Sequence, residues 1–223
     1  MLFALGTPVA FVALLAAFLL ALCLRAIAIR LTARSLGLAD RHESIWPRLR
    51  EDVDPFGAVG VAIGGVGWGK MLSVDDIPRF RGRLRPAMVF LAGPLVNIVL
   101  GEILVGAYAV AYPDSVASYV SPGSVLLGIG GLPAGQVVLL SLGVGLLSFG
   151  VLGLIPIPPL DGFGVMYNAL RRPGASIQWM RLWFEEKNIG VVILLACCLF
   201  PLPGPILLRV IDALDSLFLL WWG

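Results

Sequence analysis

Residues 154–162 have the sequence Leu-Ile-Pro-Ile-Pro-Pro-Leu-Asp-Gly, and they end a long run without any charged side chain. Three prolines, Pro156, Pro158 and Pro159, exclude a helix here, because proline lacks an amide donor and restrains the residue before it. We therefore expect an extended chain at the edge of a membrane. This chain presents Asp161, and a carboxylate at such depth needs a partner and marks a candidate functional site.

The composition indicates a membrane protein. Of the 223 residues, 59% are hydrophobic and 13% are charged, whereas a soluble domain is about 25% charged. These values exclude an ordinary soluble enzyme and a disordered chain. The net charge of +2 is too small for the basic field of a nucleic-acid binder. The length predicts that residues 1–223 form a single polytopic membrane domain.

The uncharged stretches predict where the chain crosses the membrane. A spanning helix needs about 20 predominantly apolar residues, and such runs lie near 8–30, 86–112, 135–157 and 188–221. The last run contains Pro201, Pro203 and Pro205, so it is kinked or broken at 201–205, as one bent helix or as two short pieces. The predicted fold class is an all-α integral membrane protein with about four to six transmembrane helices.

A further apolar stretch, residues 56–69, is short and contains six glycines. Glycine is a poor helix former. We expect a short re-entrant or extended segment near 56–78 that packs against other helices, because irregular backbone is tolerated at membrane depth only where protein buries it.

Basic residues predict the orientation, because they accumulate on the cytoplasmic side. They gather in the loops 31–85 and 158–187, whereas the loop 113–134 has only the acidic Asp114. We therefore expect the first two loops in the cytoplasm and the third outside. The basic stretch Arg79–Arg85 is expected to rest on anionic lipids.

Two other motifs accompany Pro156–Gly162. Ala92-Gly-Pro-Leu-Val-Asn97 begins a predicted span, and Gly67-Trp-Gly-Lys70 precedes it. In this order and spacing, the three motifs resemble the site-2 protease family of intramembrane zinc metalloproteases, and most closely a compact bacterial branch. The resemblance covers roughly residues 20 to 215 and implies a multi-pass protein of the bacterial inner (plasma) membrane. It also implies that Asp161 holds the position of the third zinc ligand. The other family positions are Gly93, Pro94, Asn97, Pro156, Pro158, Pro159 and Gly162.

The chain lacks the family's His-Glu-x-x-His motif, in which two histidines bind zinc and the glutamate activates water. When the chain is aligned on Leu36-Gly37, the motif falls on residues 25–29. Arg25 then stands at the first ligand, Ala26 at the general base and Ile29 at the second ligand.

No other residues supply the missing ligands. The single histidine, His42, lies in a charged loop, and Trp46 stands where a second ligand would follow. The three cysteines match no zinc spacing and are expected to be small buried residues. Because catalytic zinc normally takes three protein ligands, we expect no zinc and no catalysis, as in a pseudoprotease.

Arg25 suggests what replaces the metal. Inside a span it costs about 2.5–3.5 kcal/mol on insertion scales unless it pairs or snorkels. Our hypothesis is an Arg25–Asp161 ion pair with two parallel hydrogen bonds. The alternative is that Arg25 snorkels to the cytoplasmic surface. Glu102 is the other charged residue noted inside a predicted span, the one near 86–112, and it is expected to be protonated or hydrogen-bonded.

The chain would keep the fold of the family but lack its catalytic residues. We therefore expect an accessory subunit or adaptor that binds another integral membrane protein, as part of a larger complex. Two alternatives stay open. One is an active intramembrane zinc metalloprotease with atypical ligands, in which Asp161 and His42 meet a third group. The other is a small transporter or proton-conducting subunit that uses Glu102, Arg25 and Asp161.

Overall fold

A computed structural model of the chain describes residues 2–40, 42, 44–79, 82–115, 120–199 and 205–222. This part of the chain is helical, and its only strand-like pairing is one isolated bridge between Val53 and Gly69. The helices are η1 (Leu2–Gly6), α1 (Pro8–Ser35), α2 (Leu49–Asp52), α3 (Pro55–Gly64), α4 (Leu84–Ala111), α5 (Pro122–Leu126), α6 (Ala134–Gly153), α7 (Asp161–Ala169), α8 (Ala175–Met180), η3 (Arg181–Glu186), α9 (Ile189–Leu199), α10 (Ile206–Leu219) and η4 (Leu220–Trp222).

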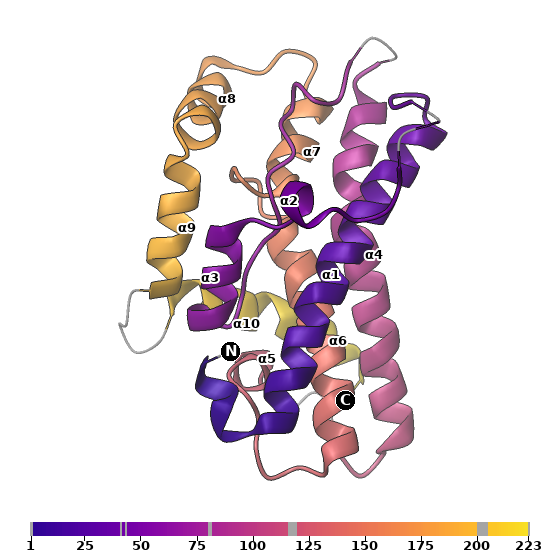
Figure 1. Ribbon diagram of the computed structural model, residues 1–223, viewed down its shortest axis with the longest axis vertical. Helices are drawn as coiled ribbons and strands as arrows, with labels where there is room; N and C mark the ends of the chain where they lie inside the picture. Colours follow the sequence, from indigo (N-terminus) through magenta and orange to yellow (C-terminus); the bar gives the residue numbers. More distant parts are fainter. Residues whose placement is uncertain are drawn as a thin grey trace.

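Three of these helices, α1, α4 and α6, are long and apolar enough to cross a membrane. They pack against one another along the long axis of the molecule, with α4 running opposite to α1 and α6 (Figure 1). The all-α membrane fold class is thereby confirmed. The three helices match the spans predicted near 8–30, 86–112 and 135–157.

Glycine allows the helices of this bundle to approach closely. A Cβ atom at Gly101 of α4 would stand 2.6 Å from the backbone nitrogen of Leu147 on α6. Lipid tails are as apolar as the helix surfaces, so the hydrophobic effect does not drive helices together within a membrane. Small residues at such contacts instead allow close van der Waals packing between the helix backbones. Any larger residue at Gly101 would push α4 and α6 apart.

The fourth predicted span is divided into two short helices. α9 has 11 residues and α10 has 14, so neither reaches the length of a spanning helix. Figure 1 shows α10 lying across the long helices rather than along them. The sequence left open one bent helix or two pieces, and the structure has two. Pro201 and Pro203, the predicted break points, lie outside the described residues.

The glycine-rich segment is more regular than predicted. Pro55–Gly64 forms α3 and is not extended, and the chain then folds back over this helix, as expected of a re-entrant segment. Asp54 caps the helix by accepting a hydrogen bond from the Phe56 amide at 3.0 Å. The helix ends at Gly65, whose φ of 79° is left-handed, and residues 66–73 then return without helix. The cap and the packing of the returning chain outweigh the low helix propensity of glycine.

The proline-rich stretch is a turn and not the extended chain we expected. The Ile157 amide donates to the Ile155 carbonyl at 2.8 Å, and the Leu160 amide donates to the Ile157 carbonyl at 2.9 Å. The peptide bond between Pro158 and Pro159 is cis. α7 begins immediately after this turn, at Asp161. The turn therefore places the carboxylate at the start of a helix that packs against α4.

Candidate functional site

The candidate site is centred on two side chains 136 residues apart in the sequence. Arg25 on α1 donates from Nε to Asp161 Oδ2 at 2.6 Å and from Nη2 to Asp161 Oδ1 at 2.5 Å. This is the two-pronged geometry that a guanidinium makes with a carboxylate. Arg25 is only 6% exposed and Asp161 4%. A snorkelling arginine would expose its charged group, so the structure contradicts that alternative.

Two glycines from different motifs make room for the guanidinium. A Cβ atom at Gly93 of α4 would stand 2.7 Å from Arg25 Cγ. One at Gly69, in the chain that returns from α3, would stand 3.0 Å from Arg25 Nη1. The Gly67–Lys70 and Ala92–Asn97 motifs therefore meet at the Arg25 side chain. Both motifs serve to enclose the ion pair.

A substitution at Gly93 tests this enclosure. We expect Gly93→Ala to lower the free energy of unfolding by about 1–3 kcal/mol, as overpacking does elsewhere. The Arg25 side chain cannot move aside easily, because Asp161 holds its far end. Thermal unfolding in mild detergent measures the effect. Gly174→Ala is the matched control, since a Cβ there meets nothing within 4 Å. Equal stability of the two variants would contradict the expectation.

The motif asparagine also serves packing. Asn97 is fully buried, and its Nδ2 donates to the Ala21 carbonyl on α1 at 3.2 Å and to the Gly93 carbonyl at 3.1 Å. Pro94 lies inside α4, and a Cβ at Gly153 would stand 3.2 Å from its ring. Asn97 therefore ties α4 to the helix that carries Arg25.

The turn after α6 uses its glycine in the same way. A Cβ atom at Gly162 would stand 2.1 Å from the Leu154 carbonyl oxygen. The residue after Asp161 must therefore be small if α7 is to begin where it does. The proline motif positions the carboxylate through its backbone shape.

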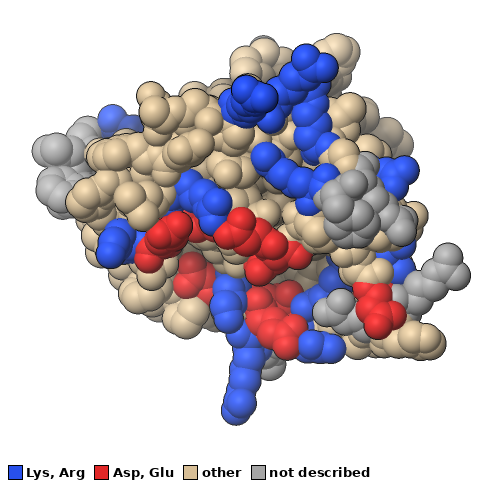
Figure 2. All heavy atoms as spheres, turned by 90° about the horizontal axis from the view of Figure 1, so that it is seen from above, with Lys and Arg blue, Asp and Glu red and all other residues tan. Residues whose placement is uncertain are grey.

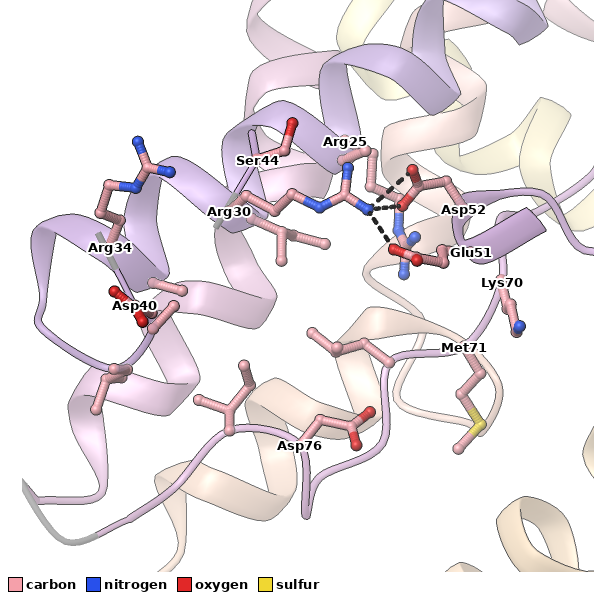
Figure 3. Close-up of a pocket in the computed structure, with 17 residues that line it drawn as sticks. Arg25, Arg30, Arg34, Asp40, Ser44, Glu51, Asp52, Lys70, Met71 and Asp76 are labelled. Carbon is pink, nitrogen blue, oxygen red and sulfur yellow. Dashed lines mark hydrogen bonds and ion pairs between the residues drawn. The ribbon is translucent and has the colours of Figure 1, made fainter. Parts of the chain in front are cut away.

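Ala26 and Ile29, the other positions of the missing motif, are buried apolar residues that line a cavity of about 410 Å³ beside Arg25. Figure 3 shows this cavity, in which Arg30 reaches to Asp52 and Glu51. The Arg30 Nη2 atom lies 2.9 Å from Asp52 Oδ1 and 3.5 Å from Glu51 Oε2. The cavity thus has an apolar wall from α1 and a rim of paired charges.

The rim belongs to a charged end of the molecule. Figure 2 looks down on the upper end of Figure 1, and basic and acidic side chains gather around this face. The end of α1 and the start of α4 lie here (Figure 1). Charged groups therefore collect where the long apolar helices end.

The side chains around Asp161 do not fit a zinc ion. A guanidinium offers only donors, and Ala26 and Ile29 offer no ligand atom. His42 is exposed, and Glu43 lies outside the described residues. Within the part of the chain that the structure describes, no three histidine, cysteine, aspartate or glutamate side chains come together as a metal site.

Glu102 has a partner that the sequence did not indicate. The indole Nε1 of Trp222 donates to Glu102 Oε2 at 2.9 Å. A Cβ at Gly106 would stand 2.6 Å from the indole ring, so this glycine admits Trp222 to the surface of α4. Nine residues of helix separate Gly93 from Glu102, about 13 Å along the axis. Glu102 therefore belongs to a different part of the bundle from the ion pair.

A further buried acid, Asp215, was not expected from the sequence. Asp215 on α10 has no exposed surface, and the Ser148 hydroxyl on α6 donates to its Oδ2. The neighbouring Asp212 accepts from the Gly123 amide of α5 at 2.7 Å. These carboxylates inside an expected span were the available signal that residues 206–219 do not face lipid on every side.

Arg79, the first residue of the expected lipid-binding stretch, is engaged within the protein. Its Nε donates to Asn168 Oδ1 and its Nη2 to the Tyr167 carbonyl, both at 2.7 Å. Arg83 and Arg85 are exposed, and Arg81 lies outside the described residues. Lipid binding by Arg79–Arg85 stays a prediction, and Arg79 is unavailable for it in this structure.

Comparison with known proteins finds one relative. A protein of Bacillus subtilis (strain 168) with the name "Putative zinc metalloprotease YwhC" is 25% identical over 167 residues, which are 72% of this chain and 67% of that protein. No protein-family model matches the chain, and no solved structure matches it. The identity supports a distant metalloprotease-like relationship.

Proposed function

We propose that this chain is a catalytically inactive relative of the site-2 proteases that binds another integral membrane protein, as an accessory subunit or adaptor of a larger complex. The observation that carries the proposal is the buried Arg25–Asp161 pair. In the family resemblance, Asp161 would ligate zinc and position 25 would be the first histidine. A guanidinium now satisfies the carboxylate that the metal would otherwise bind.

The loss of chemistry follows from the neighbouring residues. Position 26 would hold the general base and position 29 the second ligand, and the chain has Ala26 and Ile29 there. An alanine cannot take a proton from water, and an isoleucine cannot bind a metal. The residues at hand can hold a scaffold together, and they supply neither a nucleophile nor its activation.

Retention of the bundle supports a binding role. Gly69, Gly93 and Asn97 still serve the packing around position 25, so the scaffold persists where the catalytic groups do not. Exposed apolar side chains on α1, α4 and α9 are available to a neighbouring membrane protein as well as to lipid.

We also propose the inner (plasma) membrane of a bacterium as the location. The gathering of charged residues at the upper end of the bundle (Figure 2) supports an orientation with this end in the cytoplasm. The loop after α4 would then lie outside.

Co-purification and metal analysis test the proposal together. The native full chain is extracted in mild detergent, its stoichiometric partners are identified by mass spectrometry, and its zinc is measured. We expect a defined set of membrane partners and no stoichiometric zinc. Zinc near one per chain that is lost in Asp161→Ala would overturn the proposal in favour of an atypical protease. A protein that purifies alone, and conducts protons in vesicles until Glu102→Gln stops it, would overturn it in favour of a transporter.

A further inference from the structure

A groove of about 770 Å³ lies between α3 and α9, and neither Arg25 nor Asp161 lines it. Its wall is apolar, from Val53 and Phe56 on one side and Val191, Val192 and Leu195 on the other. Phe56 is 53% exposed and Val192 64%. These exposed apolar side chains form a surface that suits a hydrocarbon chain. Its volume lies in the range of small-molecule sites.

Two exposed cations, Arg50 and Lys70, line this groove. Lys70 Nζ donates to the backbone carbonyl of Arg50 at 3.2 Å, and both side chains line the groove. Within the described residues, no carboxylate forms an ion pair with either of them. Arg30 and Arg48, at the same end of the molecule, do pair with carboxylates. Arg50 and Lys70 therefore offer the groove two exposed cations without an ion-pair partner among the described residues.

The carboxylates that line the groove, Asp54 and Glu185, are buried and held by other partners, whereas Arg50 and Lys70 are exposed. Asp54 accepts from the Trp68 indole at 2.7 Å and from the Phe56 amide at 3.0 Å, so it is committed to α3. Glu185 is 8% exposed and accepts from the Ser73 hydroxyl at 2.6 Å. Glu185 also pairs with Arg181, whose Nε atom lies 3.9 Å from Glu185 Oε2.

We propose that this groove binds an anionic phospholipid, with the phosphate between Arg50 and Lys70 and one acyl chain along the α3–α9 wall. Cations at one end of an apolar groove match an amphiphile whose charge sits at one end only. Anionic lipids are drawn to basic residues at the membrane surface. The groove also touches Pro159, in the turn before Asp161. The lipid would therefore pack against the segment that positions the buried carboxylate. The inference does not depend on the proposed function.

Native mass spectrometry of the full chain tests the proposal. The protein is purified in mild detergent and titrated with phosphatidylglycerol or with phosphatidylcholine. We expect one tightly held phosphatidylglycerol, and a loss of affinity of about tenfold or more in Arg50→Gln/Lys70→Gln. Arg171→Gln/Arg172→Gln is the matched control, because these exposed cations lie outside the groove and outside the Arg79–Arg85 stretch. It should retain the lipid.

A second variant and two competitors complete the test. Leu195→Trp fills the apolar wall and should weaken phosphatidylglycerol binding while Arg50 and Lys70 remain. Inorganic phosphate should not displace the lipid, and displacement would assign the site to a free anion. Equal binding of phosphatidylcholine, or an equal loss in the control, would overturn the proposal in favour of ordinary surface lipid. A photo-crosslinker at Val192 that captures a protein instead of lipid would also overturn it.

Discussion

Arg25→Ala should lower the free energy of unfolding by about 3–5 kcal/mol, because it leaves Asp161 buried without its counter-charge. Asp161 is 4% exposed, and Arg25 supplies both hydrogen bonds that the structure gives its side chain. A typical domain has only about 5–15 kcal/mol of stability in total. We therefore expect a large fall in folded yield, measured together with thermal unfolding in mild detergent.

The paired substitution separates the charge effect from lost packing. Arg25→Leu/Asp161→Leu removes both charges at once, and replacing a buried ion pair by apolar residues is often neutral or stabilising. It should recover most of the stability that Arg25→Ala loses. Arg83→Ala, at an exposed position, is the control for removal of an arginine. If Arg25→Ala were as stable as Arg83→Ala, the ion pair would not hold the site together.

Arg25→His/Ile29→His should convert the ion pair into a zinc site, with zinc rising from background to about one per chain. A zinc–nitrogen bond is about 2.0–2.1 Å long, so a histidine with its metal spans about the length that Arg25 spans alone. Positions 25 and 29 lie one helical turn apart, and both line the cavity beside the Arg25 side chain, which holds Asp161. The metal would then take ligands from α1 and from Asp161.

Metal analysis after purification with added zinc measures this gain. Asp161→Ala in the same background should return the zinc to background, because it removes the third ligand. Leu24→His/Ala28→His is the matched control, with the same spacing on another face of α1. Zinc binding that does not depend on Asp161, or no zinc at all, would show that position 25 and Asp161 do not occupy a former metal site.

The sequence could predict the ion pair because each partner is anomalous where it stands. Arg25 is a charge within a long apolar run, and Asp161 follows three prolines at the end of another. In the family resemblance, position 25 and Asp161 are both metal-ligand positions and so lie close together. Asp161 is then the obvious partner for Arg25. By contrast, Glu102 and Trp222 are 120 residues apart, and nothing in the local sequence connects them.

Two structural features that local sequence does not predict have a common physical origin. Glycine propensity opposes a helix at residues 55–64, but the Asp54 cap and the chain folded over Gly57 outweigh it: a Cβ there would stand 2.0 Å from the Trp68 carbonyl oxygen. Hydropathy averaged over residues 188–221 likewise hides Asp212 and Asp215, which bind α5 and α6. Local propensity does not include partners that are distant in sequence.

The sequence by itself determined the membrane class and the three long helices, because the free energy of transferring a segment from water to lipid is a sum over the side chains of a local window. The absence of the family's histidines can likewise be read directly from the sequence. Only the tertiary structure decided that Arg79 turns inward, that α10 lies across the bundle, and that Arg50 and Lys70 stand unpaired beside an apolar groove. These features depend on which surfaces meet. Which surfaces meet depends on the shapes of the packed helices and on hydrogen-bond partners that are tens of residues away in the sequence.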